Sequence, residues 1–168
     1  MAARWLLHVN SALIESELGT FRAQFTETGL ARLQFPQAKA DPLANAIDPP
    51  AKWLHQTTSA LQTMLEGKTP RILPPLDLSA GTAFRKAVWN LLLAIPGGTV
   101  QTYGELAYQL NQPKAARAVG GACGANPIPL IVPCHRVVGA NGSLTGFSGG
   151  MKWKIRLLRI EGIELPLH

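Results

Sequence analysis

The sequence predicts an α/β (α+β) protein in two parts, an N-terminal α/β domain in residues 1–80 and a helical C-terminal domain in residues 81–168. Alternating apolar and polar residues, which are typical of strands, occur only in the first part, and helical spacing dominates the second. The charge divides at the same place. Seven basic and seven acidic residues balance before residue 81, whereas nine basic and three acidic residues follow, so the second part carries the whole net charge of +6.

Two strands and one helix are expected in the N-terminal part. The alternation in GTFRAQFTETGLARLQF predicts strands over Thr20–Thr26 and Leu30–Phe35, joined by a turn around Gly29. Residues 36–50 are rich in proline and alanine, which indicates a surface connection. Apolar residues then recur at helical spacing over residues 51–67, and the glycine at the end of this run is a typical helix stop.

The prolines of KTPRILPPLDLSAG indicate a linker between the two parts, and four helices are predicted after it. Thr82 is a candidate N-cap for the first helix. Thr102 and Glu105 have the spacing of a capping box at the start of the second, and Pro113 suits the first turn of the third. The fourth is amphipathic and ends at Gly162. The short second and third helices have the arrangement of a helix-turn-helix.

Composition and motif spacing exclude several classes of protein. No apolar run approaches the ~18 residues that cross a bilayer, so we expect no membrane association. The N-terminal apolar patch is interrupted by Asn10 and followed by two glutamates, which is unlike a signal peptide. Two cysteines do not make a disulfide framework, and a reduced cytoplasmic setting is expected. The cysteines and histidines lack the paired spacing of a zinc site, so no metal is expected.

The basic C-terminal part suggests a polyanionic partner such as nucleic acid, although a charge that serves only solubility fits equally well. The third predicted helix contains Gly120 and Gly121 in succession, which cost a helix about 1 kcal/mol each relative to alanine. Lys114 and Arg117 favour a close approach of this helix to a phosphate backbone. Tight packing of the helix inside the domain is the alternative.

The stretch IVPCHRVVG places Cys134 between a proline and His135, with an arginine next. This setting favours a reactive thiol, whereas Cys123 is expected to be an inert core residue. A thiol is mostly protonated at neutral pH, so attack by sulfur requires a nearby base. Because neighbours on an extended chain face opposite sides, a direct bond between Cys134 and His135 is expected only if the chain bends sharply here, and a water between them would serve equally well. Among the three acidic residues of the basic part, Glu161 is best placed to orient the imidazole.

Four stretches together resemble a known family. TYGELA, PKAARAVGGA, NPIPLIVPCHRVVG and GFSGG…LLRIEG occur in the order and spacing of the O6-alkylguanine-DNA alkyltransferases, which repair DNA by direct reversal. The resemblance covers the C-terminal half and extends weakly into ELGTFRAQFTETGLARLQF, which is similar to the N-terminal sheet of the family. The PCHR core within this longer frame is highly specific.

The resemblance implies a ribonuclease-H-like N-terminal sheet and a C-terminal domain with a winged-helix-like helix-turn-helix. It also implies that the protein binds double-stranded DNA through the minor groove, as a monomer, with cooperative binding along the DNA left open. O6-alkylguanine would be flipped out of the duplex, and its alkyl group would pass irreversibly to the cysteine in a single turnover. O4-alkylthymine would be a further substrate. No cofactor or metal is implied.

The catalytic roles that the resemblance implies fall on four residues. Cys134 would accept the alkyl group in one in-line displacement, and His135 would act as the base through a water. Glu161 would hold the imidazole, and Asn126 would order the active-site turn.

The resemblance also implies residues that contact the DNA and the damaged base. Arg117 would fill the gap left by the flipped base, while Tyr103 would crowd the 3′ phosphate and help protonate guanine N3. The other contacts come from Gly104 and Lys114 beside the DNA, Pro129 in the alkyl pocket, the carbonyls of Val137 and Cys134 on the base's amino group, and Ser148 on O6.

The chain departs from the family pattern in three places. Phe147 stands where several members have a tyrosine, Gly124 stands where some members have an arginine, and the N-terminal half lacks the cysteine and histidine cluster that holds zinc in others. Lys152 and Lys154 are expected to add charge beside the pocket. Two other functions stay open, a lesion-binding relative that recruits excision repair and a helix-turn-helix regulator whose cysteine is incidental.

Overall fold

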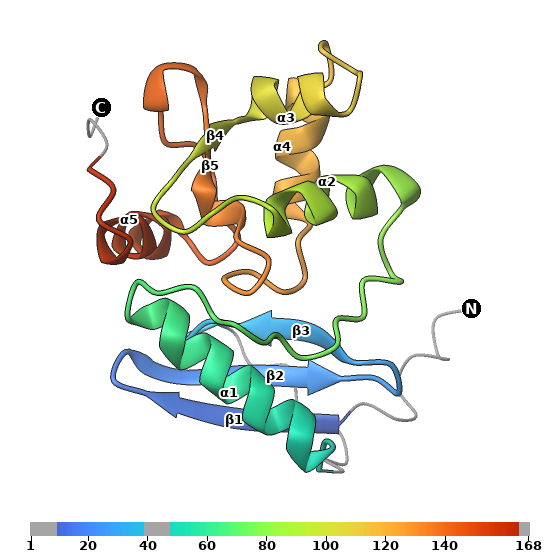
Figure 1. Ribbon diagram of the computed structural model, residues 1–168, viewed down its shortest axis with the longest axis vertical. Helices are drawn as coiled ribbons and strands as arrows, with labels where there is room; N and C mark the ends of the chain where they lie inside the picture. Colours follow the sequence, from blue (N-terminus) through green and yellow to red (C-terminus); the bar gives the residue numbers. More distant parts are fainter. Residues whose placement is uncertain (1–9, 39–47, 165–168) are drawn as a thin grey trace.

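The N-terminal half is a small antiparallel sheet covered by one helix (Figure 1). The computed structural model describes residues 10–38 and 48–164. The strands β1 (Asn10–Ser16), β2 (Gly19–Phe25) and β3 (Leu30–Gln34) lie in the order β1-β2-β3, and α1 (Ala51–Leu65) lies across them. The two predicted strands and the predicted helix are confirmed, with small shifts at their ends. Part of the expected connection over residues 36–50 lies outside the described residues.

Strand β1 was not predicted from the sequence, and its burial explains why. Its buried residues, Ser11 and Ile14, are three positions apart, and Leu13 between them is 53% exposed. The strand therefore lacks the two-residue alternation that identifies a half-buried strand. It pairs along its whole length with β2, from Asn10 opposite Phe25 to Ser16 opposite Gly19.

The proline-rich segment between the two halves is anchored to the sheet. The Leu30 N–H donates to the Pro75 carbonyl at 2.8 Å, and the Asp77 N–H donates to the Leu30 carbonyl at 2.8 Å. Leu76 thereby forms a parallel bridge with Leu30. The prolines do not prevent this, because one short bridge needs only the amide of Asp77 and the carbonyl of Pro75.

The C-terminal half contains the four predicted helices, α2 (Ala83–Leu93), α3 (Tyr103–Gln109), α4 (Ala116–Gly124) and α5 (Met151–Ile160). Two predicted caps are confirmed. The Thr82 side chain accepts from the Arg85 N–H at 3.2 Å, and Thr102 and Glu105 form a reciprocal capping box. Pro113 lies in the turn before α4 and not in its first helical turn, because the chain turns first through a hydrogen bond from Ala115 N–H to the Gln112 carbonyl.

A short parallel pair of strands brings α3 next to the segment that follows Cys134. In this pair, β4 (Gln101–Thr102) lies beside β5 (Val137–Val138). Because α3 begins directly after β4, its first residue is held close to the chain that leaves the Cys134 turn.

One hydrophobic cluster joins the two halves. It extends from Phe21 and Leu61 in the sheet and α1 to Leu92, Val119 and Leu157 in the helical part. The sheet therefore supports the helical part through a shared core. None of the helices within the described ranges is long and apolar enough to cross a membrane.

Candidate active site around Cys134

A bridged loop carries the chain into Cys134. The buried side chain of Asn126 donates from Nδ2 to the Val132 carbonyl at 2.8 Å and accepts at Oδ1 from the Ile128 N–H at 3.0 Å. Leu130, which lies between these two contacts, has a φ of 77°. This left-handed conformation costs a leucine about 1–2 kcal/mol, and the amide bridge across the loop offsets it.

The N-terminal sheet also holds this loop. The backbone N–H of Leu33, in β3, donates to the Pro127 carbonyl at 2.9 Å. The loop is therefore fixed from within by an amide side chain and from outside by a strand edge. Loop residues held in this way can position a reactive group with little reorganisation.

Cys134 begins a 3-10 turn, Cys134–Arg136, so the chain is not extended there as the sequence analysis assumed. The Cys134 side chain is 3% exposed. Burial raises the pKa of the Cys134 thiol to about 11, against the opposing effects of a hydrogen bond from Asn126 and the charge of Lys154. The sulfur is therefore a protonated thiol at neutral pH and becomes a nucleophile only when a base removes its proton.

His135 has the geometry of such a base. Its ring is fully buried, and Nε2 lies 2.9 Å from Oε1 of Glu161. A carboxylate only accepts, so Nε2 carries the proton and Nδ1 has a free lone pair. Nδ1 is buried and has no hydrogen-bond partner among the described residues. Burial lowers the pKa of His135, which keeps the imidazole neutral and able to accept a proton.

Arg136 locks the carboxylate that orients His135, and the sequence analysis did not assign it a role. Its Nε lies 3.1 Å from both oxygens of Glu161, its Nη2 lies 2.8 Å from Oε1, and its Nη1 donates to the Ile95 carbonyl at 2.7 Å. Burial alone would raise the pKa of Glu161, but hydrogen bonds from His135 and Arg136 hold it at about 2. The carboxylate is therefore ionised at any pH at which the protein is expected to work.

The end of α5 places Glu161. The helix stops in a Schellman motif, in which Gly162 N–H donates to the Arg159 carbonyl at 3.0 Å and Ile163 N–H donates to the Leu158 carbonyl at 2.9 Å. Gly162 has the left-handed φ of 75° that this motif requires. Glu161, immediately before this glycine, is thereby held at a fixed point beside His135.

Lys154 lies beside the site, as expected, but it is buried and not exposed. Its side chain is fully buried, and Nζ donates to the carbonyls of Val137 at 2.7 Å and Thr145 at 3.1 Å. Burial lowers the pKa of Lys154. The sequence contained a signal for this burial, because Lys154 lies at helical spacing from the buried Leu157 and Leu158.

Most of the predicted substrate residues line two cavities that adjoin at Gly124 and Ser148. The first, of about 850 Å³, is lined by residues at the start of α3, by residues of α4 and by residues of the loop after β5. The predicted contacts in it are Tyr103, Gly104, Arg117 and Ser148. The second, of about 630 Å³, includes Asn126, Pro129 and Ser148, together with Phe35 from the N-terminal half.

Two predicted contacts lie elsewhere. Lys114 is exposed in the turn before α4, and Val137 is fully buried. The Val137 carbonyl already accepts from Lys154, and the Cys134 carbonyl accepts from the Val137 N–H. Each carbonyl oxygen retains a second lone pair with which to accept from a base.

Helix α4 presents glycines to open space. A Cβ atom added at Gly121 or Gly124 would meet no described atom within 4 Å, and one at Gly120 would make ordinary contact with Tyr103 at 3.8 Å. Tight packing inside the domain, one of the two explanations for these glycines, is therefore wrong for Gly121. Arg117 is exposed on the same helix, one turn before Gly121.

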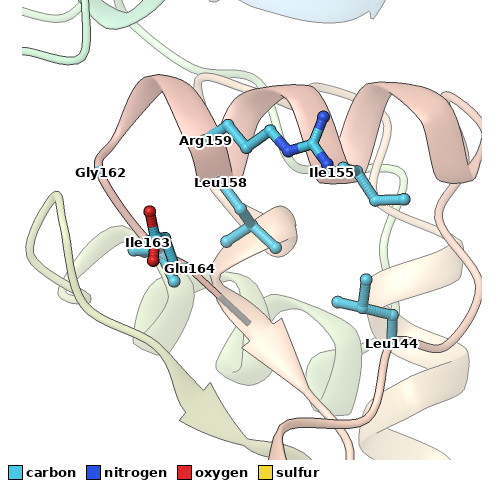
Figure 2. Close-up of a pocket in the computed structure, with 7 residues that line it drawn as sticks. All are labelled: Leu144, Ile155, Leu158, Arg159, Gly162, Ile163 and Glu164. Atoms are coloured by element: carbon cyan, nitrogen blue, oxygen red, sulfur yellow. The ribbon is translucent and has the colours of Figure 1, made fainter. Parts of the chain in front are cut away.

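Another cavity, with a volume of about 430 Å³, lies beside α5 and the residues that follow it (Figure 2). It is lined by Leu144, Ile155, Leu158, Arg159, Gly162, Ile163 and Glu164. None of these is a predicted site residue. Over residues 10–38 and 48–164, no three His, Cys, Asp or Glu side chains are grouped to hold a metal ion; His8 and His168 lie outside these ranges.

Comparison with known proteins identifies the family. Residues 83–163 match the family described as 6-O-methylguanine DNA methyltransferase, DNA binding domain. A methylated-DNA–protein-cysteine methyltransferase of Methanosarcina acetivorans is 39% identical over 160 residues, which cover 90% of this chain and 97% of the relative. One of Salmonella typhimurium is 60% identical over 87 residues, 52% of this chain and 51% of that relative. The crystal structure of Mycobacterium tuberculosis OGT in complex with DNA is similar with a TM-score of 0.79 at 38% identity, covering 91% and 92% of the two chains. The chain therefore belongs to the methylated-DNA–protein-cysteine methyltransferase family.

Proposed function

We propose that this protein repairs DNA by moving the alkyl group of O6-alkylguanine, and of O4-alkylthymine, to Sγ of its own Cys134 in a single irreversible turnover. The observation that carries the proposal is the arrangement of the buried thiol and its neighbour. His135 follows Cys134 directly, is tied through Nε2 to Glu161, and leaves Nδ1 free to accept a proton. Membership of the methylated-DNA–protein-cysteine methyltransferase family supports the same chemistry.

In the proposed reaction, the thiol proton of Cys134 passes through a water to Nδ1 of His135, and Glu161 stabilises the imidazolium. Sulfur attacks the alkyl carbon in line, so an S–C bond forms as the C–O6 bond breaks. Guanine departs as a neutral base if N3 gains a proton as the bond breaks, and the Tyr103 hydroxyl supplies it. Solvent then returns a proton to Tyr103. The thioether has no leaving group that would regenerate the thiol, so each molecule acts once.

We also propose that the substrate is double-stranded DNA, bound through its minor groove by a helix-turn-helix made of α3 and α4. The contact between these two helices, the exposed Arg117 and the uncovered Gly121 and Gly124 support it. Small residues allow the helix backbone to approach phosphates closely. The net charge of +6 supports sequence-independent attraction to DNA, which weakens as salt rises.

Further details belong to the same proposal. The N-terminal sheet is ribonuclease-H-like and the C-terminal part winged-helix-like, with a boundary after residue 80. The protein acts as a monomer in the cytoplasm and uses no cofactor. The resemblance of the sequence to the family supports these details, and the mixed α/β fold, similar to that of Mycobacterium tuberculosis OGT, supports those that concern the fold.

Mass spectrometry after incubation with a duplex that carries one O6-methylguanine tests the proposed function. We expect one methyl group per protein molecule, and none after incubation with an undamaged duplex. The tryptic peptide over residues 118–136 contains both cysteines, so fragmentation must assign the methyl group to Cys134. Methyl loss from the DNA by more than one equivalent per protein would contradict a single turnover. An unmodified peptide from protein that binds the lesion tightly would instead identify a lesion-binding protein.

The proposed role of Arg117 predicts a difference between two substrates. Arg117→Ala is expected to slow repair of an O6-methylguanine duplex by about 100-fold, because extrusion of a base costs a few kcal/mol and the empty stack is no longer filled. Reaction with free O6-benzylguanine, which needs no extrusion, should stay near the wild-type rate. Single-turnover rate constants on both substrates measure the effect. Lys114→Ala is the matched control and should weaken binding to damaged and undamaged duplex alike. Equal losses of Arg117→Ala on the two substrates would contradict the role.

A further inference from the structure

We infer that Thr145 is a positioning residue for Tyr103, fixing the direction of the phenolic proton and stabilising the oxygen as that proton leaves. The inference rests on the proposed function and deepens it, since it concerns how the guanine receives a proton. Nothing in the sequence motifs pointed to Thr145, which lies in the loop between β5 and α5.

The geometry places a donor on the phenol oxygen. The Thr145 hydroxyl donates from Oγ1 to the Tyr103 oxygen at 2.9 Å. A phenol carries one proton of its own and accepts through its lone pairs. Because Thr145 occupies a lone pair, the proton of Tyr103 has to point away from Thr145. Both side chains line the 850 Å³ cavity, together with Arg117 and Ser148.

The environment of Tyr103 makes a hydrogen-bond donor to its oxygen useful for proton transfer. Burial raises the pKa of Tyr103, which makes its proton harder to give up, and the hydrogen bond from Thr145 acts in the opposite direction. Transfer of the proton to guanine N3 leaves negative charge on the phenol oxygen. A hydrogen bond to a charged group is stronger than one to a neutral group, so the Thr145 bond strengthens as the proton leaves.

Lys154 fixes Thr145 in turn. Its buried ammonium donates to the Thr145 carbonyl at 3.1 Å and to the Val137 carbonyl at 2.7 Å, and it lies 5.9 Å from the centre of the Tyr103 ring. The loop residue is thereby anchored to α5. Thr145 itself is exposed in the free protein, and a base bound in the cavity would shield its hydroxyl from water.

Matched variants of Thr145 test the inference on the reaction. Thr145→Val keeps the branched shape and loses the donor, and its single-turnover rate constant on an O6-methylguanine duplex should fall about tenfold, as expected for losing one hydrogen bond to a developing charge. Thr145→Ser keeps the donor and should stay within about twofold of wild type on the same grounds. The dissociation constant for the duplex should not change. In a Tyr103→Phe background, Thr145→Val should have no further effect.

A second measurement needs no substrate. The chain has two tyrosines, so a Tyr108→Phe background leaves Tyr103 as the one phenol that is titrated by ultraviolet absorbance. Thr145→Val should raise the pKa of Tyr103, whereas Thr145→Ser should not, with circular dichroism recorded at each pH to follow the fold.

The two arms separate the failure of this inference from that of the proposed function. Wild-type protein that transfers no methyl group would overturn the proposed function and, with it, the role of Thr145. If the wild-type protein transfers the methyl group, three results would overturn the inference alone. The first is an equal rate in Thr145→Val, and the second is an unchanged pKa of Tyr103 in that variant. The third is a Thr145→Val effect that is as large in the Tyr103→Phe background as in wild type.

Discussion

Cys134→Ala is expected to abolish alkyl transfer while leaving binding to the damaged duplex intact. The variant lacks the thiol of Cys134, which directly precedes the proposed base His135. The proposed DNA contacts, Tyr103 on α3 and Arg117 on α4, are untouched. Removal of the methyl group from labelled duplex measures the first effect, and gel-shift titration measures the second. Stability should fall by no more than about 1 kcal/mol, since one buried atom is lost.

Cys123→Ala is the matched control. Cys123 is also buried, and burial raises the pKa of its thiol to about 12, so the two cysteines resemble each other in environment. What distinguishes them is the neighbouring base, because Cys123 lies on α4 and is followed by a glycine. Cys123→Ala should therefore retain transfer near the wild-type rate. Transfer that survives in Cys134→Ala and disappears in Cys123→Ala would move the acceptor to α4.

Glu161→Gln is expected to reduce both stability and reaction rate strongly. The neutral amide leaves the buried guanidinium of Arg136 without its counter-charge, and breaking a buried ion pair in this way costs about 3–5 kcal/mol. The imidazole also loses the acceptor that fixes its tautomer. Because general-base catalysis contributes about 10²- to 10⁴-fold, the single-turnover rate of the folded variant should fall within this range.

Urea unfolding and the single-turnover rate separate the two effects, with Glu105→Gln as the control. Glu105 is exposed, and glutamine can take its place in a capping box, so this variant should stay within about 0.5 kcal/mol of wild type. A Glu161→Gln protein with wild-type rate would show that the carboxylate does not orient the base.

The pH dependence of stability offers an independent check on Glu161. Its pKa is lowered from 4.5 to about 2 in the folded protein, so its ionised form stabilises the fold fully above pH 4.5. That contribution is lost as the pH falls from 4.5 towards 2. Glu161→Gln has no such group, so the difference in unfolding free energy between the two proteins should shrink over this interval.

The elements that the sequence predicted correctly have signals within a few neighbouring residues. Caps such as Thr82 and the Thr102–Glu105 pair bond to backbone one turn away, and the buried residues of β2 alternate regularly. Strand β1 and the bridge at Leu76 depend on partners elsewhere in the chain and left no such pattern. The 3-10 turn at Cys134 was missed because three residues are too few to show a period.

The same distinction holds within the site. Cys134 and His135 were found because they are adjacent, and Glu161 because the basic half offers few carboxylates. Thr145 was missed because its contact with Tyr103 spans 42 residues and a threonine hydroxyl is unremarkable in sequence. The burial of Lys154 was not predicted because a lysine is usually exposed. The chemical roles of these residues stay predictions until the variants are measured.

The hydrogen bond from β3 to the loop before Cys134 has a consequence for which substitutions the N-terminal half can tolerate. Leu33 donates this hydrogen bond to the Pro127 carbonyl through its backbone N–H, a group that every residue except proline carries. The N-terminal half can therefore accumulate substitutions at most outward-facing positions and still hold the loop. The support that β3 gives to the loop therefore depends on the path of its main chain, whereas the support from within the loop depends on the side chain of Asn126.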